Sequence, residues 1–384
     1  MVAMIEGRQV VKIYGDPKRD TGARKPAVNE VSFSIERGEF FVVMGLSGSG
    51  KSTLLRMLNR LIDPSSGEIY IDGENLPEME SKRLREVRNK KVNMVFQHFA
   101  IFPHRTVLDN AAYGLKVRGI PKKEREERAL RALDRVGLQD WPYNYPSDLS
   151  GGMRQRVGLA RALATDAEIL LMDEPFSALD PLIRRDMQDL LLQLQAELKK
   201  TVVFVTHDLN EAMRLGDRIM VMRDGGVVQS GTVEEILASP ADDYVAEFIS
   251  DVDRSRVVTA GTVAEPARLT VTVNEVPEAV LANMSQAGES AAFVTDSAGV
   301  LLGAVHRDDL RVVSPSATDL HTVVSAEYKT VPATATLNDC FAKVGGHEVP
   351  LGVVDADRRL LGVIPRATLL STLSKPEESD HANS

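Results

Sequence analysis

Short apolar runs alternate with longer amphipathic stretches between residues 40 and 222, and they predict buried β-strands. Each run holds four or five mostly apolar residues, which is typical of a strand that is covered on both faces. We therefore expect an α/β domain in which helices cover a mainly parallel sheet. The runs are residues 40–44, 92–96, 169–172, 202–205 and 219–222.

Two further segments predict a small antiparallel flank. Residues 28–35 and 68–72 alternate apolar and polar side chains in the manner of half-buried strands, with Gly67 and Gly73 as turns. Two charged segments, 82–91 and 121–135, are most simply interpreted as solvated faces of amphipathic helices.

The region after about residue 240 contains an internal repeat, which predicts duplication of one supersecondary unit. Each copy has the pattern of helix, strand, turn, strand and helix. Convergence of two similar hairpins is the alternative. The identical pairs are Val294 and Val353, Asp296 and Asp355, Leu301 and Leu360, Leu302 and Leu361, Gly303 and Gly362, Arg307 and Arg366, and Leu310 and Leu369.

Composition limits the classes of function. With 43% apolar and 26% charged residues the chain predicts a soluble globular protein, and its net charge of -9 argues against nucleic acid as the main partner. The single cysteine, Cys340, can form neither an internal disulfide nor a thiolate metal cage, so we expect a cytosolic address. No uncharged apolar run approaches the roughly 18 to 20 residues that cross a bilayer.

Polar side chains follow four of the predicted strands, at the point where each strand ends. Ligands of open α/β sheets bind at the carboxyl ends of strands, so these positions predict one composite site. A glycine-rich loop follows residues 40–44. The other polar residues are Gln97, Asp173, Glu174, Thr206 and His207.

The glycine-rich loop has the spacing of a phosphate-binding loop between a strand and a helix over 54–61. Its glycines let successive N–H groups point at phosphate oxygens, Lys51 reaches the β and γ phosphates, and the Ser52 hydroxyl can ligate magnesium. The predicted nucleotide-binding residues are Gly45, Ser47, Gly48, Ser49, Gly50, Lys51, Ser52 and Thr53.

Asp173 and Glu174 predict the two carboxylates that such a loop requires. One would hold hydrated magnesium and the other would orient or deprotonate the attacking water. A helix cap or a surface acidic pair is the alternative. His207 gains a functional interpretation from its place at the end of another strand.

Residues 149–155 predict a second helix start that could bind an anion. Ser150 can cap the helix, while Gly151 and Gly152 allow a ligand to approach the first N–H groups. From these residues alone, an ordinary capped helix is at least as good an interpretation.

Together these segments resemble the ATP-binding subunit of an ABC transporter, from about Val10 to Val252. Four segments are similar in sequence to glycine betaine/proline (quaternary-amine) importers, namely residues 44–53, 58–62, 149–162 and 176–184. The resemblance implies a P-loop ABC-type ATPase domain with an antiparallel β flank and a helical subdomain over residues 1–252. The repeat resembles a tandem CBS pair, which implies a smaller α+β domain over 253–374. We expect a disordered tail at 375–384.

The resemblance also implies roles for single residues. Two copies would hold two ATP molecules head to tail, with the phosphate loop of one facing the signature segment 149–155 of the other. Tyr14 would stack on adenine, and Asp180 belongs to the segment 177–180 that bridges the subunits. The implied catalytic residues are Glu174, His207, Gln97 and Lys51, and the implied magnesium residues are Ser52, Gln97 and Asp173.

The function so implied is ATP hydrolysis that drives import of a compatible solute through a separate membrane permease, supplied by a substrate-binding protein. The chain would be peripheral, at the cytoplasmic face of the plasma membrane, and the apolar loop 98–104 would receive a permease helix unless it buries itself. The alternatives are an importer of another solute such as an amino acid, a soluble ABC ATPase that acts on nucleic acid or ribosomes, and a nucleotide-sensing module.

CBS pairs that bind adenine nucleotides resemble one another in a Thr or Ser and an Asp after the second strand. The corresponding residues here are His306 and Asp309 in the first copy and Pro365 and Thr368 in the second. Because this pattern is mostly absent, a dimerisation scaffold or an ionic-strength or other ligand sensor is at least as good an expectation.

Overall fold

The computed structural model describes residues 3–15, 25–96, 100–250, 255, 258–312, 319–326, 328–344 and 350–373. The chain divides into two compact units, Met1–Val252 and Asp253–Ser384. The tail predicted at 375–384 lies outside the described residues, as does Gln97.

The first unit contains a six-stranded sheet with the order β10-β9-β3-β8-β7-β6. Neighbours from β9 to β6 pair in parallel, as predicted, while β10 pairs antiparallel with β9 at the edge. Every residue of β3, β7 and β8 is buried, because helices and a second sheet cover both faces. The strands are β3 (Phe40–Met44), β6 (Val92–Val95), β7 (Ile169–Asp173), β8 (Thr201–Thr206), β9 (Arg218–Arg223) and β10 (Gly226–Gly231).

The predicted antiparallel flank is confirmed as a four-stranded sheet with the order β2-β1-β4-β5. Its strand β1 was not predicted, because the register with β2 shifts between Gly7 and Val10, where Gln9 has a φ of 48°. Such a bulge moves the alternation of apolar and polar residues out of phase. The strands are β1 (Ile5–Lys12), β2 (Val28–Ile35), β4 (Ser66–Ile71) and β5 (Glu74–Asn75).

Alternate residues of β3 supply the cores on the two faces of the central sheet. Phe41 and Val43 belong to the cluster shared with the antiparallel sheet and with the first helix. On the other face, the ring of Phe40 lies 5.9 Å from that of Phe204, which in turn contacts Phe176. The Phe176 contact anchors the segment that leads from β7 towards the following helix.

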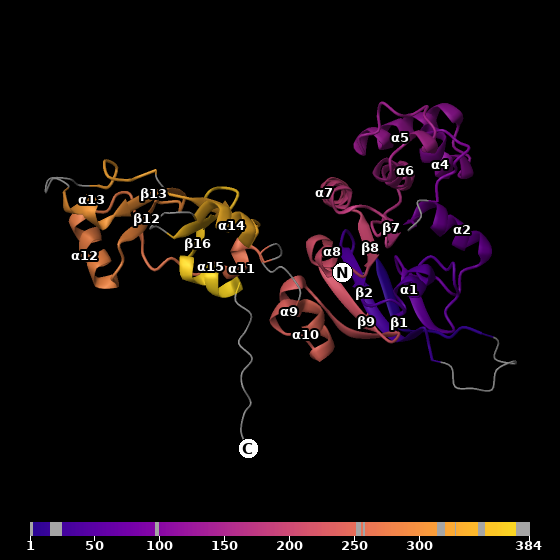
Figure 1. Ribbon diagram of the computed structural model, residues 1–384, viewed down its shortest axis with the longest axis horizontal. Helices are drawn as coiled ribbons and strands as arrows, with labels where there is room; N and C mark the ends of the chain where they lie inside the picture. Colours follow the sequence, from indigo (N-terminus) through magenta and orange to yellow (C-terminus); the bar gives the residue numbers. More distant parts are fainter. Residues whose placement is uncertain are drawn as a thin grey trace, which may run out of the picture. The chain divides into compact units, whose positions relative to one another are not determined.

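Three helices of the first unit form one group. Figure 1 shows α4, α5 and α6 together, beyond one end of the central strands. The first predicted helix ends earlier than expected, at Met57, because the chain turns at Arg60, which has a φ of 54°. The helices are α1 (Lys51–Met57), α2 (Ser81–Lys90), α3 (Val107–Ala111), α4 (Tyr113–Val117), α5 (Lys122–Arg135), α6 (Gly151–Ala164), α7 (Pro181–Leu198), α8 (Leu209–Leu215), α9 (Val233–Ala238) and α10 (Asp243–Ser250), with a short 3-10 helix at Pro146–Asp148.

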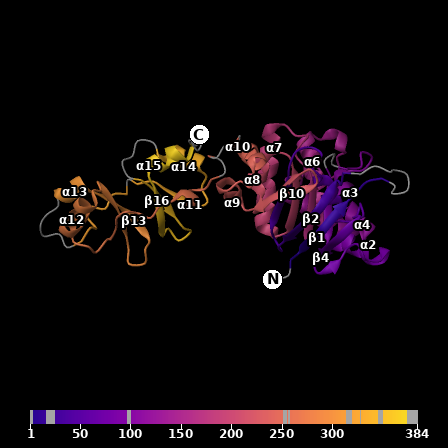
Figure 2. The same cartoon turned by 90° about the horizontal axis from the view of Figure 1, so that it is seen from below.

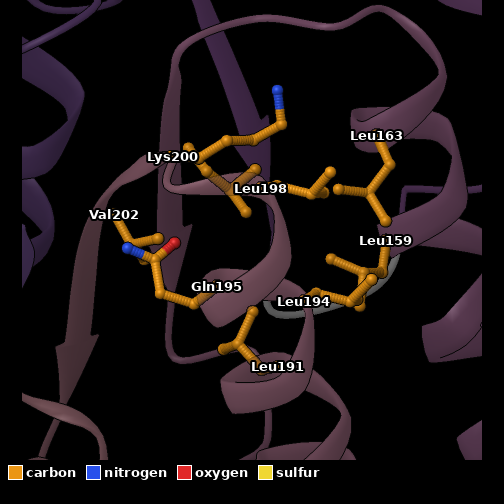
Figure 3. Close-up of a pocket in the computed structure, with 9 residues that line it drawn as sticks. Leu159, Leu163, Leu191, Leu194, Gln195, Leu198, Lys200 and Val202 are labelled. Carbon is orange, nitrogen blue, oxygen red and sulfur yellow. The ribbon is translucent and has the colours of Figure 1, made fainter. Parts of the chain in front are cut away.

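A leucine-lined pocket separates α6 from α7. Leu159 and Leu163 of α6 face Leu191, Leu194 and Leu198 of α7 across it (Figure 3). Strands β7 and β8 contribute the remaining apolar wall, through Leu170 and Val202. Because most of the lining is aliphatic, α6 and α7 pack against each other here through apolar side chains.

Among the helices that the structure describes, none is both long and apolar enough to span a membrane.

The second unit consists of two sheets with the same architecture, with the orders β11-β12-β13 and β14-β15-β16. Figure 2 shows α12 and α13 beside β13, and α14 and α15 beside β16. The predicted helix, strand, turn, strand and helix of each copy is confirmed. The leading strands β11 and β14 were not predicted, because three residues are too few to show alternation. The elements are α11 (Ala260–Val263), β11 (Thr270–Thr272), α12 (Pro277–Ala287), β12 (Ala291–Thr295), β13 (Leu301–His306), α13 (Arg307–Arg311), β14 (Thr330–Pro332), α14 (Leu337–Val344), β15 (Leu351–Val354), β16 (Leu360–Ile364) and α15 (Arg366–Leu373).

The hairpin turns of the two copies pair with each other in a pseudo-twofold manner. Leu301 N donates to Arg358 O at 3.0 Å, and Leu360 N donates to Gly299 O at 3.3 Å. These bonds are equivalent, since Leu301 and Leu360 occupy the same position of the repeat. A duplicated unit explains this symmetry better than two unrelated hairpins do.

Candidate nucleotide site

The glycine-rich loop connects β3 to α1 and holds the side chain of Lys51. Gly45 and Gly48 have φ values of 147° and 83°, which only glycine adopts readily. Lys51 is 5% exposed, and its Nζ donates to Gly45 O at 2.7 Å and to Leu46 O at 3.0 Å. Burial lowers the pKa of Lys51, while the nearby carboxylates of Glu174 and Asp173 oppose that shift. The loop therefore keeps a cation close to its own backbone.

Two features show that the loop fits a polyanionic ligand. The hydroxyl of Ser49 is buried and has no hydrogen-bond partner among the described residues. The first turn of α1 begins at Gly50, which supplies no side-chain cap. A phosphate group satisfies such hydroxyl and N–H donors, and the end of the helix dipole favours its negative charge.

Ser52 and Asp173 lie side by side and form an oxygen pair. Ser52 Oγ donates to Asp173 Oδ1 at 2.7 Å, and Asp173 is 5% exposed at the end of β7. Magnesium prefers such oxygen ligands and completes its shell with substrate phosphates and water. No group of three or more acidic, histidine or cysteine side chains that could hold a metal occurs among the described residues. The pair therefore fits magnesium only together with a bound phosphate.

Arg56 also contacts Asp173, which the sequence did not predict. Its Nη2 lies 3.1 Å from Asp173 Oδ2, so the carboxylate is shared between a hydroxyl and a guanidinium. The available signal was spacing, because Arg56 follows Ser52 by one helical turn.

Glu174 and His207 follow the neighbouring strands β7 and β8 and meet at the carboxyl ends of these strands. His207 Nδ1 lies 3.1 Å from Glu174 Oε2. Glu174 has a φ of 43°, a strained conformation for a residue with a side chain, and its N–H donates to Val205 O at 3.0 Å. The backbone bond to β8 thus fixes the position of Glu174 beside the end of that strand.

Tyr14 lies close to the first turns of α1. Its hydroxyl is 3.2 Å from Thr53 Oγ1, and the Lys12 ammonium lies 5.4 Å from the ring centre. About half of Tyr14 is exposed. Its predicted role towards adenine stays a prediction.

The second predicted helix start has the expected local form. Ser150 Oγ accepts from Met153 N at 3.3 Å, which caps α6, and Asp180 caps α7 by accepting from Ile183 N at 3.0 Å. A Cβ on Gly152 would lie 2.5 Å from Ile183 Cγ2, so the two helix starts are neighbours. Gly151, between Ser150 and Gly152, is partly exposed.

The contacts of the described residues separate the predicted site residues into two groups. Ser52 bonds to Asp173, His207 contacts Glu174, and Lys51 lies close enough to both carboxylates for their charges to oppose the lowering of its pKa. Among the described residues, no hydrogen bond or ion pair joins these five to Ser150, Gly151, Gly152 or Asp180. The roles predicted for Gln97 stay predictions, because Gln97 lies outside the described residues.

The described part of the loop at 98–104 is partly self-buried. The ring of Phe102 lies 4.5 Å from that of Tyr113, and Arg105 covers both rings. Asn110 is fully buried and bonds both the N–H and the carbonyl of Phe102. Pro103 and His104 are exposed, so the described part of this segment contains both half-buried and accessible side chains.

A phosphate loop, an acidic strand end and a glycine-rich helix start on this fold define an ATP-binding cassette. The family model described as ABC transporter matches residues 28–177. The glycine betaine transport ATP-binding protein OpuAA of Bacillus subtilis is 50% identical over 91% of this chain and 84% of its own length. The glycine betaine/proline betaine transport system ATP-binding protein ProV of Escherichia coli is 44% identical over 98% of both chains.

A solved structure supports the same family. It is a dimeric post-hydrolysis state of an ATP-binding cassette bound to ADP and Pi, 37% identical with a TM-score of 0.54, covering 60% of this chain and 99% of that one. The chain belongs to the ABC transporter family, as its ATP-binding subunit. The predicted ABC-type ATPase fold is thereby confirmed.

Proposed function

We propose that this chain is the ATP-hydrolysing subunit of an importer for a quaternary amine such as glycine betaine or proline betaine. The observation that carries the proposal is the convergence of Lys51, Ser52, Asp173, Glu174 and His207 on one position. Relatives that match nearly the whole chain are glycine betaine and proline betaine transport proteins, which supports this solute class.

The residues of the first group would share the work of phosphoryl transfer. The loop N–H groups and Lys51 bind the triphosphate, and Glu174 Oε2 accepts a proton from the water that attacks the γ-phosphorus as its bond to the leaving ADP breaks. His207, at 3.1 Å, orients that carboxylate. Ser52 and Asp173 would hold magnesium, which supplies charge neutralisation on the β and γ phosphates.

The second group completes the proposal only in a pair of chains. Among the described residues, Ser150 and Asp180 bond within the starts of α6 and α7 and not to the first group. We assign Ser150, Gly151 and Gly152 to the phosphates held by a second copy, and Asp180 to the segment that bridges the two copies. Dimeric cassettes among the structural relatives support this arrangement. The chain would then act on a permease at the cytoplasmic face of the plasma membrane, as a peripheral subunit. A substrate-binding protein would deliver the solute to that permease.

We propose that the second unit is a regulatory tandem CBS domain. Support comes from the two equivalent sheets and from the symmetric bonds between their turns. Thr368 Oγ1 donates to Glu265 Oε1 at 2.6 Å, so this hydroxyl is engaged within the unit. We therefore favour a sensor of ionic strength or another osmotic signal over an adenine-nucleotide site.

Uptake of labelled glycine betaine tests the proposed function. Cells that carry the whole operon are shifted to high osmolarity, and uptake by the wild type is compared with uptake by Lys51→Ala. Uptake of labelled proline and of a labelled neutral amino acid is measured in parallel. We expect betaine uptake that rises with osmolarity and disappears in the variant. If betaine is not taken up but the chain still copurifies with a membrane protein, the solute assignment is wrong and an importer of another solute remains. Copurification with nucleic acid instead would overturn the importer function.

A further inference from the structure

Arg184 connects two loops that flank the proposed hydrolysis site. Its Nη2 donates to Leu179 O at 3.2 Å, in the segment that leads from Glu174 to α7. Its Nη1 lies 3.3 Å from Asp208 Oδ2, directly after His207. One side chain at the start of α7 therefore links the loop after β7 to the turn after β8.

Hydrogen bonds within the segment from Glu174 to Asp180 restrict its movement. Ser177 Oγ donates to Glu174 O at 3.0 Å, and Leu179 N donates to Phe176 O at 3.1 Å. A displacement of this segment would therefore reach Glu174 through the backbone. It would reach His207 by two routes, through the Glu174 carboxylate at 3.1 Å and through Arg184, which bridges the two loops.

Arg184 also joins α7 to α8, but it does more than that. Its Nε has no hydrogen-bond partner among the described residues and forms an ion pair with Glu211 Oε1 of α8 at 3.7 Å. Gln188, one turn further along α7, contacts the same Glu211 Oε1 with Nε2 at 3.3 Å and accepts from Arg214 at 2.9 Å. Both residues therefore join the helices, and Arg184 in addition bonds to the loop after β7 and to Asp208 in the turn after β8.

We infer that Arg184 is a positioning residue that transmits the position of the segment 177–180 to the Glu174–His207 pair. The inference rests on the proposed function, in which this segment faces a second copy of the chain. Contact with that copy would shift the Leu179 carbonyl, and Arg184 would move Asp208 and the adjacent His207 with it. Hydrolysis would then depend on the arrival of the partner.

Steady-state ATPase measurements on the full chain test the inference with matched variants. Arg184→Met removes both loop contacts and an ion pair with Glu211, Gln188→Met removes only contacts between α7 and α8, and Arg185→Met changes the exposed neighbouring arginine. We expect Arg184→Met to lower kcat about 10-fold, as for loss of a charge-assisted hydrogen bond, with KM for ATP changed less than about two-fold. Gln188→Met should lower thermal stability but keep kcat within about two-fold, and Arg185→Met should change neither.

A conservative variant and a double-mutant cycle separate positioning from structural support. Arg184→Lys should restore part of kcat, because an ammonium can reach one loop but not both. Asp208→Asn keeps an oxygen that can cap α8, and its effect on kcat should not add to that of Arg184→Met. Additive losses, or a loss of kcat in Gln188→Met as large as in Arg184→Met, would overturn the inference.

The proposed function is tested separately by ATP-dependent pairing of Glu174→Gln, followed by light scattering. If this variant stays monomeric with ATP, the paired arrangement fails, and the inference fails with it. If it pairs while Arg184→Met hydrolyses ATP at the wild-type rate, only the role of Arg184 is wrong.

Discussion

Alanine at Gly45 should abolish ATP binding, whereas alanine at Gly48 should only weaken it. Both glycines have positive φ values, so either substitution incurs a backbone cost of about 1–3 kcal/mol. At Gly48 this cost is the whole effect, because nothing lies within 4 Å of the new Cβ. A loop that must keep this conformation to bind would lose affinity about ten-fold for each 1.4 kcal/mol.

Gly45 adds a steric conflict with the backbone of the central sheet. Its Cβ would lie 2.2 Å from Met222 O, where even 3.0 Å is closer than real Cβ contacts come. Met222 belongs to β9, which pairs with β10 on one side and β3 on the other. It cannot move aside without breaking the hydrogen bonds to these strands. The loop itself must therefore leave its position, and with it the carbonyl groups that hold Lys51.

Isothermal titration with ATP and urea unfolding without nucleotide measure the two effects separately. Gly73→Ala is the matched control, because Gly73 has a φ of 79° in open space outside the loop. It should lose about 1–3 kcal/mol of unfolding free energy and keep wild-type ATP affinity. If Gly45→Ala binds ATP as tightly as Gly48→Ala does, the steric argument is refuted.

Three other substitutions test the site and its support. Glu174→Gln should keep ATP affinity and stall hydrolysis, and single-turnover release of phosphate at the wild-type rate would show that Glu174 is not the base. Burial raises the pKa of Glu211, so the folded state holds its proton longer than the unfolded state and stability falls as pH rises through that interval. Glu211→Gln should remove this slope from urea titrations at several pH values, and an unchanged slope would assign it to other groups. Leu191→Ala, beside the pocket between α6 and α7, should cost about 2–5 kcal/mol in unfolding free energy, unless its neighbours refill the space, which a loss below about 1 kcal/mol would reveal.

Apolar pattern located most of the central sheet because its strands are buried on both faces. The predicted ranges 40–44 and 28–35 coincide with β3 and β2. Strand β10 was not predicted, since an edge strand with only Gly231 buried lacks an apolar run. Local pattern is thus informative where burial is complete and fails where pairing alone defines the strand.

The sequence predicted which loops meet at the site. It did not predict which arginines hold these loops in place. Glu174 and His207 follow neighbouring strands, so the topology alone brings them together. Arg56 and Arg184 act through long side chains that cross between elements, and many arginines of the chain have the same reach. Only the coordinates distinguish these two from Arg185.

The symmetric pairing of turns in the second unit has a consequence for its local unfolding. Each copy has an apolar cluster of its own, and a small third cluster that includes Phe293, Leu301 and Val363 combines both. We therefore expect that either copy can open while the other keeps its own core, as cooperative units of unequal stability do in hydrogen exchange. Opening of either copy would break the shared cluster and the shared turn bonds. A perturbation at the turns should therefore change the hydrogen-exchange rates of both copies.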